Sequence, residues 1–130
     1  MTVSNVARLQ EAYQAYVERK DLSVFGDMLV PDVEWIAFDG ENACRNRDEV
    51  LATVQDAIAQ GTGVGLPEFI GGGDTFVMIP RLDRLPPFFP DDAEGLFQVV
   101  EMQNGKILRM RDFAKRSQAL SAAGLPAQPD

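Results

Sequence analysis

Apolar and polar residues follow a helical period in the first part of the chain. Residues 4–19 place apolar side chains three or four positions apart, which is typical of an amphipathic helix. Asp21 can cap a second, short helix that we expect to end at Pro31, because proline lacks the N–H that a helix needs. The β-branched and aromatic residues at 33–38 then predict a strand.

A third helix is predicted at residues 48–60, where Asn46 followed by Glu49 resembles a capping box. After it the apolar period changes from helical to alternating, which favours strands joined by turns. The expected elements are strands at 66–70 and 75–83, a proline-rich loop at 85–94, a hairpin at 95–114 and a short helix ending at Ala123.

The hairpin is the most sharply defined part of the pattern. Asn104-Gly105 favours a two-residue type I′ loop, since both residues must adopt positive φ. With strict alternation, Asp112 projects from an apolar face, where a carboxylate is costly to bury unless it finds a partner. The expected pairs are Gln103 with Lys106, Glu101 with Leu108, Val99 with Met110, and Phe97 with Asp112.

The strand at 75–83 ends in a cation and an anion on the face that also carries Val77 and Ile79. If this face and the Asp112 face line the same concave side, Arg81 can bridge Asp83 and Asp112 with charge-assisted bonds. Burial and like charge would then make one carboxyl an acid and the other a base. The alternative is an ordinary surface ion pair between Arg81 and Asp83.

The order of elements favours a single α+β domain spanning residues 1–130. Successive strands without intervening helices predict an antiparallel sheet with the helices on one face. A curved sheet wrapped around the N-terminal helices would leave an apolar pocket between them, a usual place for a ligand.

Composition narrows the chemistry. The net charge of −8 argues against a nucleic-acid partner. The chain has no histidine, which excludes Ser-His-Asp catalysis and His-ligated zinc, and we expect no metal or other cofactor. The single cysteine, Cys44, fits a reducing compartment, and no signal peptide or membrane span is evident, so we expect a cytoplasmic protein.

The helix order and the Asn-Gly hairpin with its Arg111-Asp112 ending resemble the NTF2-like superfamily, which includes SnoaL-like cyclases and ketosteroid isomerase. Within it, Arg81-Leu82-Asp83, GLFQVVEMQNGKI and Arg111-Asp112-Phe113 resemble limonene-1,2-epoxide hydrolase. The resemblance implies an α+β cone, a homodimer and one-step hydrolysis of a small, apolar, neutral epoxide. In those roles Asp83 would protonate the epoxide oxygen, Asp112 would activate water, and Arg81 would hold both.

The first strand departs from the hydrolase pattern. A Tyr and an Asn that help to hold the water are replaced by Trp35 and Ala37, and Asp39 can compensate or simply form a turn before Gly40. Tyr13 lies where isomerase-like members carry an oxyanion-binding tyrosine, although its spacing is equally typical of a helix core. An isomerase or cyclase and a non-catalytic binding protein therefore remain alternatives. The residues expected around the substrate and water are Trp35, Ala37, Asp39, Tyr13, Phe97, Val99 and Met110.

Overall fold

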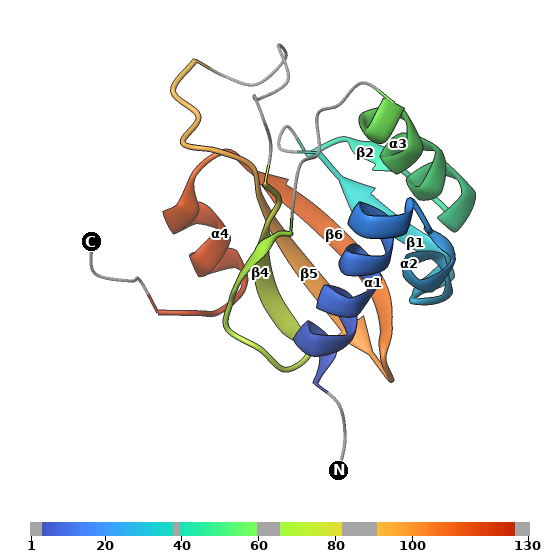
Figure 1. Cartoon of the computed structure of the whole chain (residues 1–130). Helices are drawn as coiled ribbons and strands as arrows, with labels where there is room; N and C mark the ends of the chain where they lie inside the picture. The colour runs from blue at the N-terminus through green and yellow to red at the C-terminus, as the bar shows by residue number, and fades with distance from the viewer. Residues whose placement is uncertain (1–3, 38–39, 60–65, 82–90, 127–130) are drawn as a thin grey trace.

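The computed structural model describes residues 4–37, 40–59, 66–81 and 91–126. Within these ranges the chain forms one mixed sheet with strand order β2-β1-β6-β5-β4-β3, together with four helices (Figure 1). The elements are α1 (Asn5–Arg19), α2 (Ser23–Asp27), β1 (Leu29–Ile36), β2 (Asn42–Cys44), α3 (Arg47–Ala59), β3 (Glu68–Ile70), β4 (Thr75–Ile79), β5 (Phe97–Gln103), β6 (Lys106–Phe113) and α4 (Arg116–Ala122).

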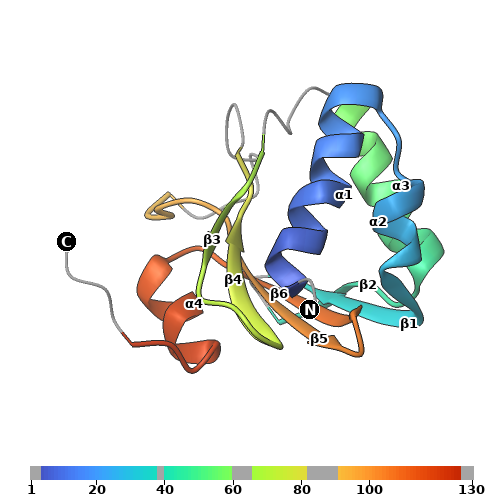
Figure 2. The same ribbon diagram turned by 60° about the horizontal axis from the view of Figure 1, so that its bottom comes forward.

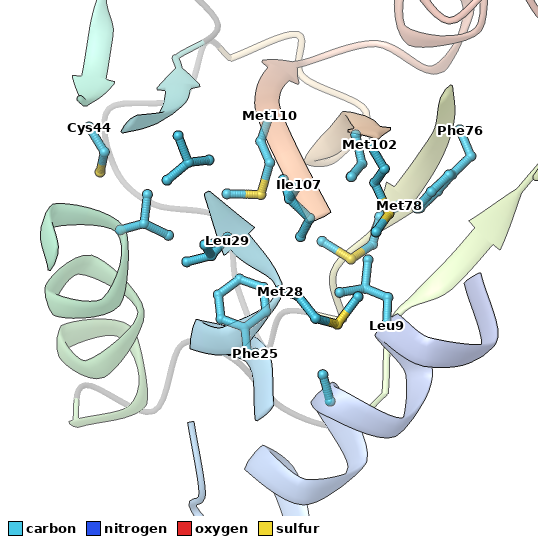
Figure 3. Close-up of a cluster of buried hydrophobic side chains, with 14 residues drawn as sticks. Leu9, Phe25, Met28, Leu29, Cys44, Phe76, Met78, Met102, Ile107 and Met110 are labelled. Carbon is cyan, nitrogen blue, oxygen red and sulfur yellow. The ribbon is translucent and has the colours of Figure 1, made fainter. Parts of the chain in front are cut away.

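Helices cover both faces of the sheet. Figure 2 shows α1, α2 and α3 on one face, which we call the helix-facing side, and α4 on the other, which we call the α4 side. The helix-facing core is rich in methionine and aromatic side chains, including Met28, Met78, Met102, Met110 and Phe25 (Figure 3). A second cluster lies under α4 and contains Val77, Phe97, Val99, Ala119 and Leu120.

The expected α+β architecture is confirmed, and the curved sheet is open rather than closed into a barrel. The expectation of a purely antiparallel sheet is wrong at one pair, because β1 runs parallel to β6. β1 also begins at Leu29, before Pro31, so this proline lies inside a strand. The β1–β6 register is interrupted between Leu29 and Glu34, which is where a residue without an N–H can be accommodated.

The helix signal at Asn46 is confirmed, whereas α2 has Leu22 rather than Asp21 at its N-cap and ends at Asp27, before Pro31. The Ser4 side chain accepts the Ala7 N–H at 3.0 Å at the start of α1, and Asn46 Oδ1 accepts the Glu49 N–H at 2.9 Å at the start of α3. The strand at 75–83 is shorter than expected and ends at Ile79, while β2 was not anticipated. Among the described helices, none is both long and apolar enough to cross a membrane.

A β-bulge in the hairpin changes which residues share a face. Asn104 and Gly105 have φ of 54° and 76°, as a type I′ loop requires, and Gln103 pairs with Lys106 as expected. The register then shifts so that Glu101 pairs with Arg109 rather than with Leu108. The expected pairs of Val99 with Met110 and Phe97 with Asp112 are therefore wrong. The observed pairs are Val100 with Met110 and Gln98 with Asp112.

Candidate functional site

Asp112 lies on the helix-facing side of β6, between its neighbours β1 and β5. Met110, two residues earlier on the same face, is only 2% exposed and belongs to the helix-facing core. The Asp112 side chain is half-buried rather than completely enclosed. The carboxyl therefore sits beside apolar packing, on a side chain that is not completely enclosed by the rest of the chain.

Two donors from the neighbouring strands converge on one oxygen of this carboxyl. Trp35 Nε1 on β1 donates to Asp112 Oδ1 at 2.8 Å, and Gln98 Nε2 on β5 donates to the same atom at 3.1 Å. Gln98 is 3% exposed and is the only polar residue counted as buried in the part of the chain that the structure describes. Within that part, no hydrogen bond to Asp112 Oδ2 is observed.

Burial dominates the electrostatics of Asp112. Desolvation raises its pKa from 3.8 to about 6, while the hydrogen bonds from Trp35 and Gln98 lower it by less. Among the described residues, no cation contributes to the shift of this pKa. A carboxyl with a pKa near 6 exchanges protons readily close to neutral pH, which is what a general acid or base requires.

Tyr13 on α1 extends the site from the helix layer. Its ring lies 5.5 Å from that of Phe25 and 5.9 Å from that of Tyr16, and it packs against the helix-facing core. Burial raises the pKa of the Tyr13 phenol, and its electrostatic interactions with Tyr16 and Asp112 raise it further. The phenol therefore stays protonated as a hydrogen-bond donor, and it interacts electrostatically with Asp112.

The proposed triad is not assembled from described residues. Arg81 is exposed, and both Asp83 and Asp39 lie outside the described ranges, so the triad stays a prediction. Ala37 follows β1 and belongs to a turn, where its N–H donates to the Glu41 carbonyl at 2.8 Å.

The bulge also separates residues that we expected to lie together. Met110 and Trp35 pack with the helix-facing core and Tyr13 joins them there, in agreement with their expected side. Phe97 and Val99 instead pack under α4 with Val77 and Ile79, on the face opposite to Asp112, so their expected contact with its site is wrong. The expectation that the face of Val77 and Ile79 and the face of Asp112 line the same side is wrong as well. Gln98 was missed for the same reason, because strict alternation places it on the other face.

Neither metal binding nor a reactive thiol is indicated by the described residues. Among them, no group of three or more histidine, cysteine or acidic side chains could hold a metal ion. Cys44 is buried with its Sγ 3.4 Å from Thr53 Oγ1, and burial raises the pKa of its thiol. A thiol with a raised pKa is a poor nucleophile near neutral pH.

On the α4 side of the same strands, two arginines lie beside one glutamate, Glu101. The Arg109 guanidinium donates to both oxygens of Glu101, with the Nη2–Oε1 bond at 3.0 Å, and Arg111 Nε lies 3.8 Å from Glu101 Oε2. The Arg109 bond lowers the pKa of Glu101. Arg111 also reaches towards α4, where Nη2 donates to the Ala122 carbonyl at 3.4 Å.

Comparisons with solved structures identify the fold. An NTF2-like protein of unknown function from Burkholderia pseudomallei is 21% identical, with 94% of this chain and 98% of that chain covered and a TM-score of 0.58. A protein described as a "putative polyketide cyclase" from Sinorhizobium meliloti is 16% identical, with 83% and 92% covered and a TM-score of 0.57. An uncharacterised cystatin-fold protein from Novosphingobium aromaticivorans is 14% identical, with 86% and 99% covered and a TM-score of 0.64.

The chain thus has the NTF2-like fold, in agreement with the resemblance drawn from its sequence. No protein-family description matches the sequence, and no curated protein matches it either. Nothing in these similarities points specifically to limonene-1,2-epoxide hydrolase.

Proposed function

We propose that the protein catalyses proton transfer on a small, apolar, neutral carbonyl compound, with Asp112 as the proton acceptor and donor. The observation that carries this proposal is the Asp112 carboxyl on the helix-facing side, whose pKa burial raises to about 6. Such a group is largely ionised at pH 7 yet holds a transferred proton well enough to return it. It therefore suits a reaction that moves a proton from one position of a substrate to another.

Tyr13 supplies the second part of the chemistry. When ionised Asp112 removes a proton from the carbon next to a carbonyl, the electron pair moves to the carbonyl oxygen and forms an enolate. A neutral phenol can donate to that oxygen and stabilise its charge. The raised pKa of Tyr13 keeps its proton in place, and the same electrostatic environment contains Asp112.

The fold supports this assignment only in a general way. Proteins with one fold carry out many reactions, so function must be argued from the site. One structural neighbour is described as a "putative polyketide cyclase", and cyclisation of a polyketide begins with enolate chemistry of the kind proposed here. The net charge of −8 disfavours anionic substrates, which agrees with a neutral one.

Epoxide hydrolysis is the second candidate. It is favoured by the Arg81-Leu82-Asp83 sequence and by the Trp35–Asp112 bond, which places an N–H donor beside a carboxyl that could activate water. This reaction also needs an acid at the epoxide oxygen, the role assigned to Asp83. The exposed position of Arg81 and the single-carboxyl character of the described site make it the weaker of the two.

The test is a screen of enones, 1,3-diketones and terpene epoxides with the wild-type protein in deuterated water. Isomerisation, or deuterium entering at the carbon next to the carbonyl, would support proton transfer. Asp112→Asn should abolish this signal. Tyr13→Phe should lower it about 10²-fold, the scale of a lost oxyanion donor, whereas the matched control Tyr16→Phe should change it little.

The alternatives give different products in the same screen. A diol that carries label when the screen is repeated in ¹⁸O-water, with no exchange into carbonyl compounds, would replace proton transfer by epoxide hydrolysis. Binding of apolar ligands without any turnover would contradict both enzymatic proposals and leave a binding protein.

A further inference from the structure

We infer that Trp35 and Gln98 are positioning residues that hold Asp112 by one carboxyl oxygen, Oδ1, and so present the other, Oδ2, to the substrate. This inference rests on the proposed role of Asp112 in proton transfer and adds to it the parts that aim the carboxyl. It concerns two side chains that act through Asp112 and need not touch the substrate themselves.

Strand order explains how two side chains can hold one carboxyl oxygen from both sides. β6 lies between β1 and β5, so Asp112 has a hydrogen-bonded strand on each side. Gln98 is its direct partner in the β5–β6 register, while Trp35 pairs with Met110, two residues before Asp112 on the same face. The two donors therefore reach Oδ1 from opposite sides, 77 and 14 residues away in the chain.

The chemistry of the donors fits positioning rather than proton transfer. An indole N–H and a primary amide do not titrate near neutral pH and cannot take up the substrate proton. The atoms bonded to Oδ1, Trp35 Nε1 and Gln98 Nε2, are hydrogen-bond donors. Hydrogen bonds of this kind favour the charged carboxylate. They oppose the effect of burial and keep the carboxyl in its basic form at a lower pH than burial alone would allow.

Burying the Gln98 amide is unfavourable unless it forms hydrogen bonds. Gln98 is 3% exposed and lies in a strand whose other helix-facing residues, Val100 and Met102, are apolar. Burying an amide without partners is unfavourable, so its bond to Asp112 accounts for its presence. Methionine has a similar length and would fill the same space without the donor.

The decisive measurement is the pKa of the Asp112 carboxyl, followed directly by carbon-detected NMR titration in Gln98→Met and Trp35→Phe. Each substitution removes one donor to the charged form, so we expect the pKa to rise by about one. Gln103→Met makes the same chemical change on β5, at an exposed position next to the hairpin loop, and should leave it unchanged. Amide spectra should show that each variant is folded.

Kinetics provide a second reading with any substrate found in the screen. The acidic limb of the pH–rate profile should move upwards by about one pH unit in Gln98→Met and Trp35→Phe, and not in Gln103→Met. Loss of the donors should lower kcat more than it raises KM, because the carboxyl is still present but less well aimed.

The outcomes separate this inference from the proposed function. An Asp112 pKa that stays at the wild-type value in both Gln98→Met and Trp35→Phe would overturn the inference, whatever the activity. A raised pKa in a protein that turns over no carbonyl compound would uphold the positioning and reject the proposed reaction.

Discussion

Asp112 and Glu101 are carboxylates on neighbouring strands of one sheet, yet their pKa values move in opposite directions. On the helix-facing side, burial raises the pKa of Asp112 to about 6. On the α4 side, the bond from Arg109 lowers the pKa of Glu101. The sheet supplies similar backbone surroundings to both, so the difference comes from what faces each side chain.

The difference separates a structural carboxylate from a reactive one. Glu101 has two guanidinium groups beside it and gains stability from remaining ionised. Among the described residues, Asp112 has two neutral donors and apolar neighbours, so its pKa of about 6 lets it be ionised at pH 7 and still take up a proton readily. Perturbed groups of the second kind are found preferentially at functional sites.

The largest expected effect comes from removing each acid in turn and measuring turnover. Asp112→Asn should lower kcat by about 10²-fold or more, because the amide cannot accept the substrate proton. Glu101→Gln makes the same change on the other face and should keep kcat within about twofold, since it alters only a half-exposed ion pair. Equal losses in the two variants would show that Asp112 has no special part in the reaction.

The pH dependence of stability should distinguish the two acids next. The raised pKa of Asp112 means that the folded chain binds this proton more tightly than the unfolded chain, so its contribution to stability is greatest below about pH 4 and is lost as the pH rises to about 6. Urea denaturation at about pH 4.5 and pH 7.5 should therefore show a decrease of about 2 kcal/mol in the wild type relative to Asp112→Asn.

If the difference in the free energy of unfolding between the wild type and Asp112→Asn is the same at both pH values, Asp112 is not desolvated. The comparison with the variant is essential because every other acid titrates in both proteins.

Glu101→Gln should have a smaller effect with the opposite sign in pH. The lowered pKa of Glu101 stabilises the folded chain at neutral pH, and this contribution is lost as the pH falls below the unfolded value of 4.5. The pair is partly exposed, so the variant should lose about 1 kcal/mol or less in the free energy of unfolding. Raising the salt concentration to about 1 M should reduce this difference; a loss that is insensitive to salt would point to packing instead.

Deleting Leu108 should have the smallest effect on the site around Asp112. Leu108 is the extra residue of the bulge and is 38% exposed, so its removal joins Ile107 directly to Arg109 and leaves the pairs on both sides unchanged. We expect a change of less than about 2 kcal/mol in the free energy of unfolding. The indole N–H resonance of Trp35, the only tryptophan, should still report its bond to Asp112, and a shift to a free indole position would contradict this account of the register.

The bulge also marks the limit of what alternation can predict. Asn104-Gly105 determines the loop through its positive φ angles, a purely local property. The register beyond it depends on Ile107 and Met110, which are three residues apart and would lie on opposite faces of a regular strand. Both are buried in the helix-facing core, and the extra residue between them allows this. Only the packing of the whole sheet makes that choice favourable.

The site shows the same division between local and distant information. The cost of burying Asp112 on an apolar face was evident from the sequence, and so was the N–H donor of Trp35. The role of Gln98 was not, because its face depends on the bulge. The parallel pairing of β1 with β6 was missed because it joins distant segments, and Asp83 lies outside the described residues, so its proposed role still awaits a test.

The placement of β6 between β1 and β5 has a consequence for how the protein is made. β1 emerges from the ribosome early, whereas its parallel partner is among the last strands to be synthesised. Contacts between segments so far apart in the sequence form slowly. The edge of β1 that later pairs with β6 therefore stays unpaired until β6 has been synthesised. The bond between Trp35 and Asp112 then joins the first described strand to the last, and tryptophan fluorescence during refolding should report when β6 pairs with β1.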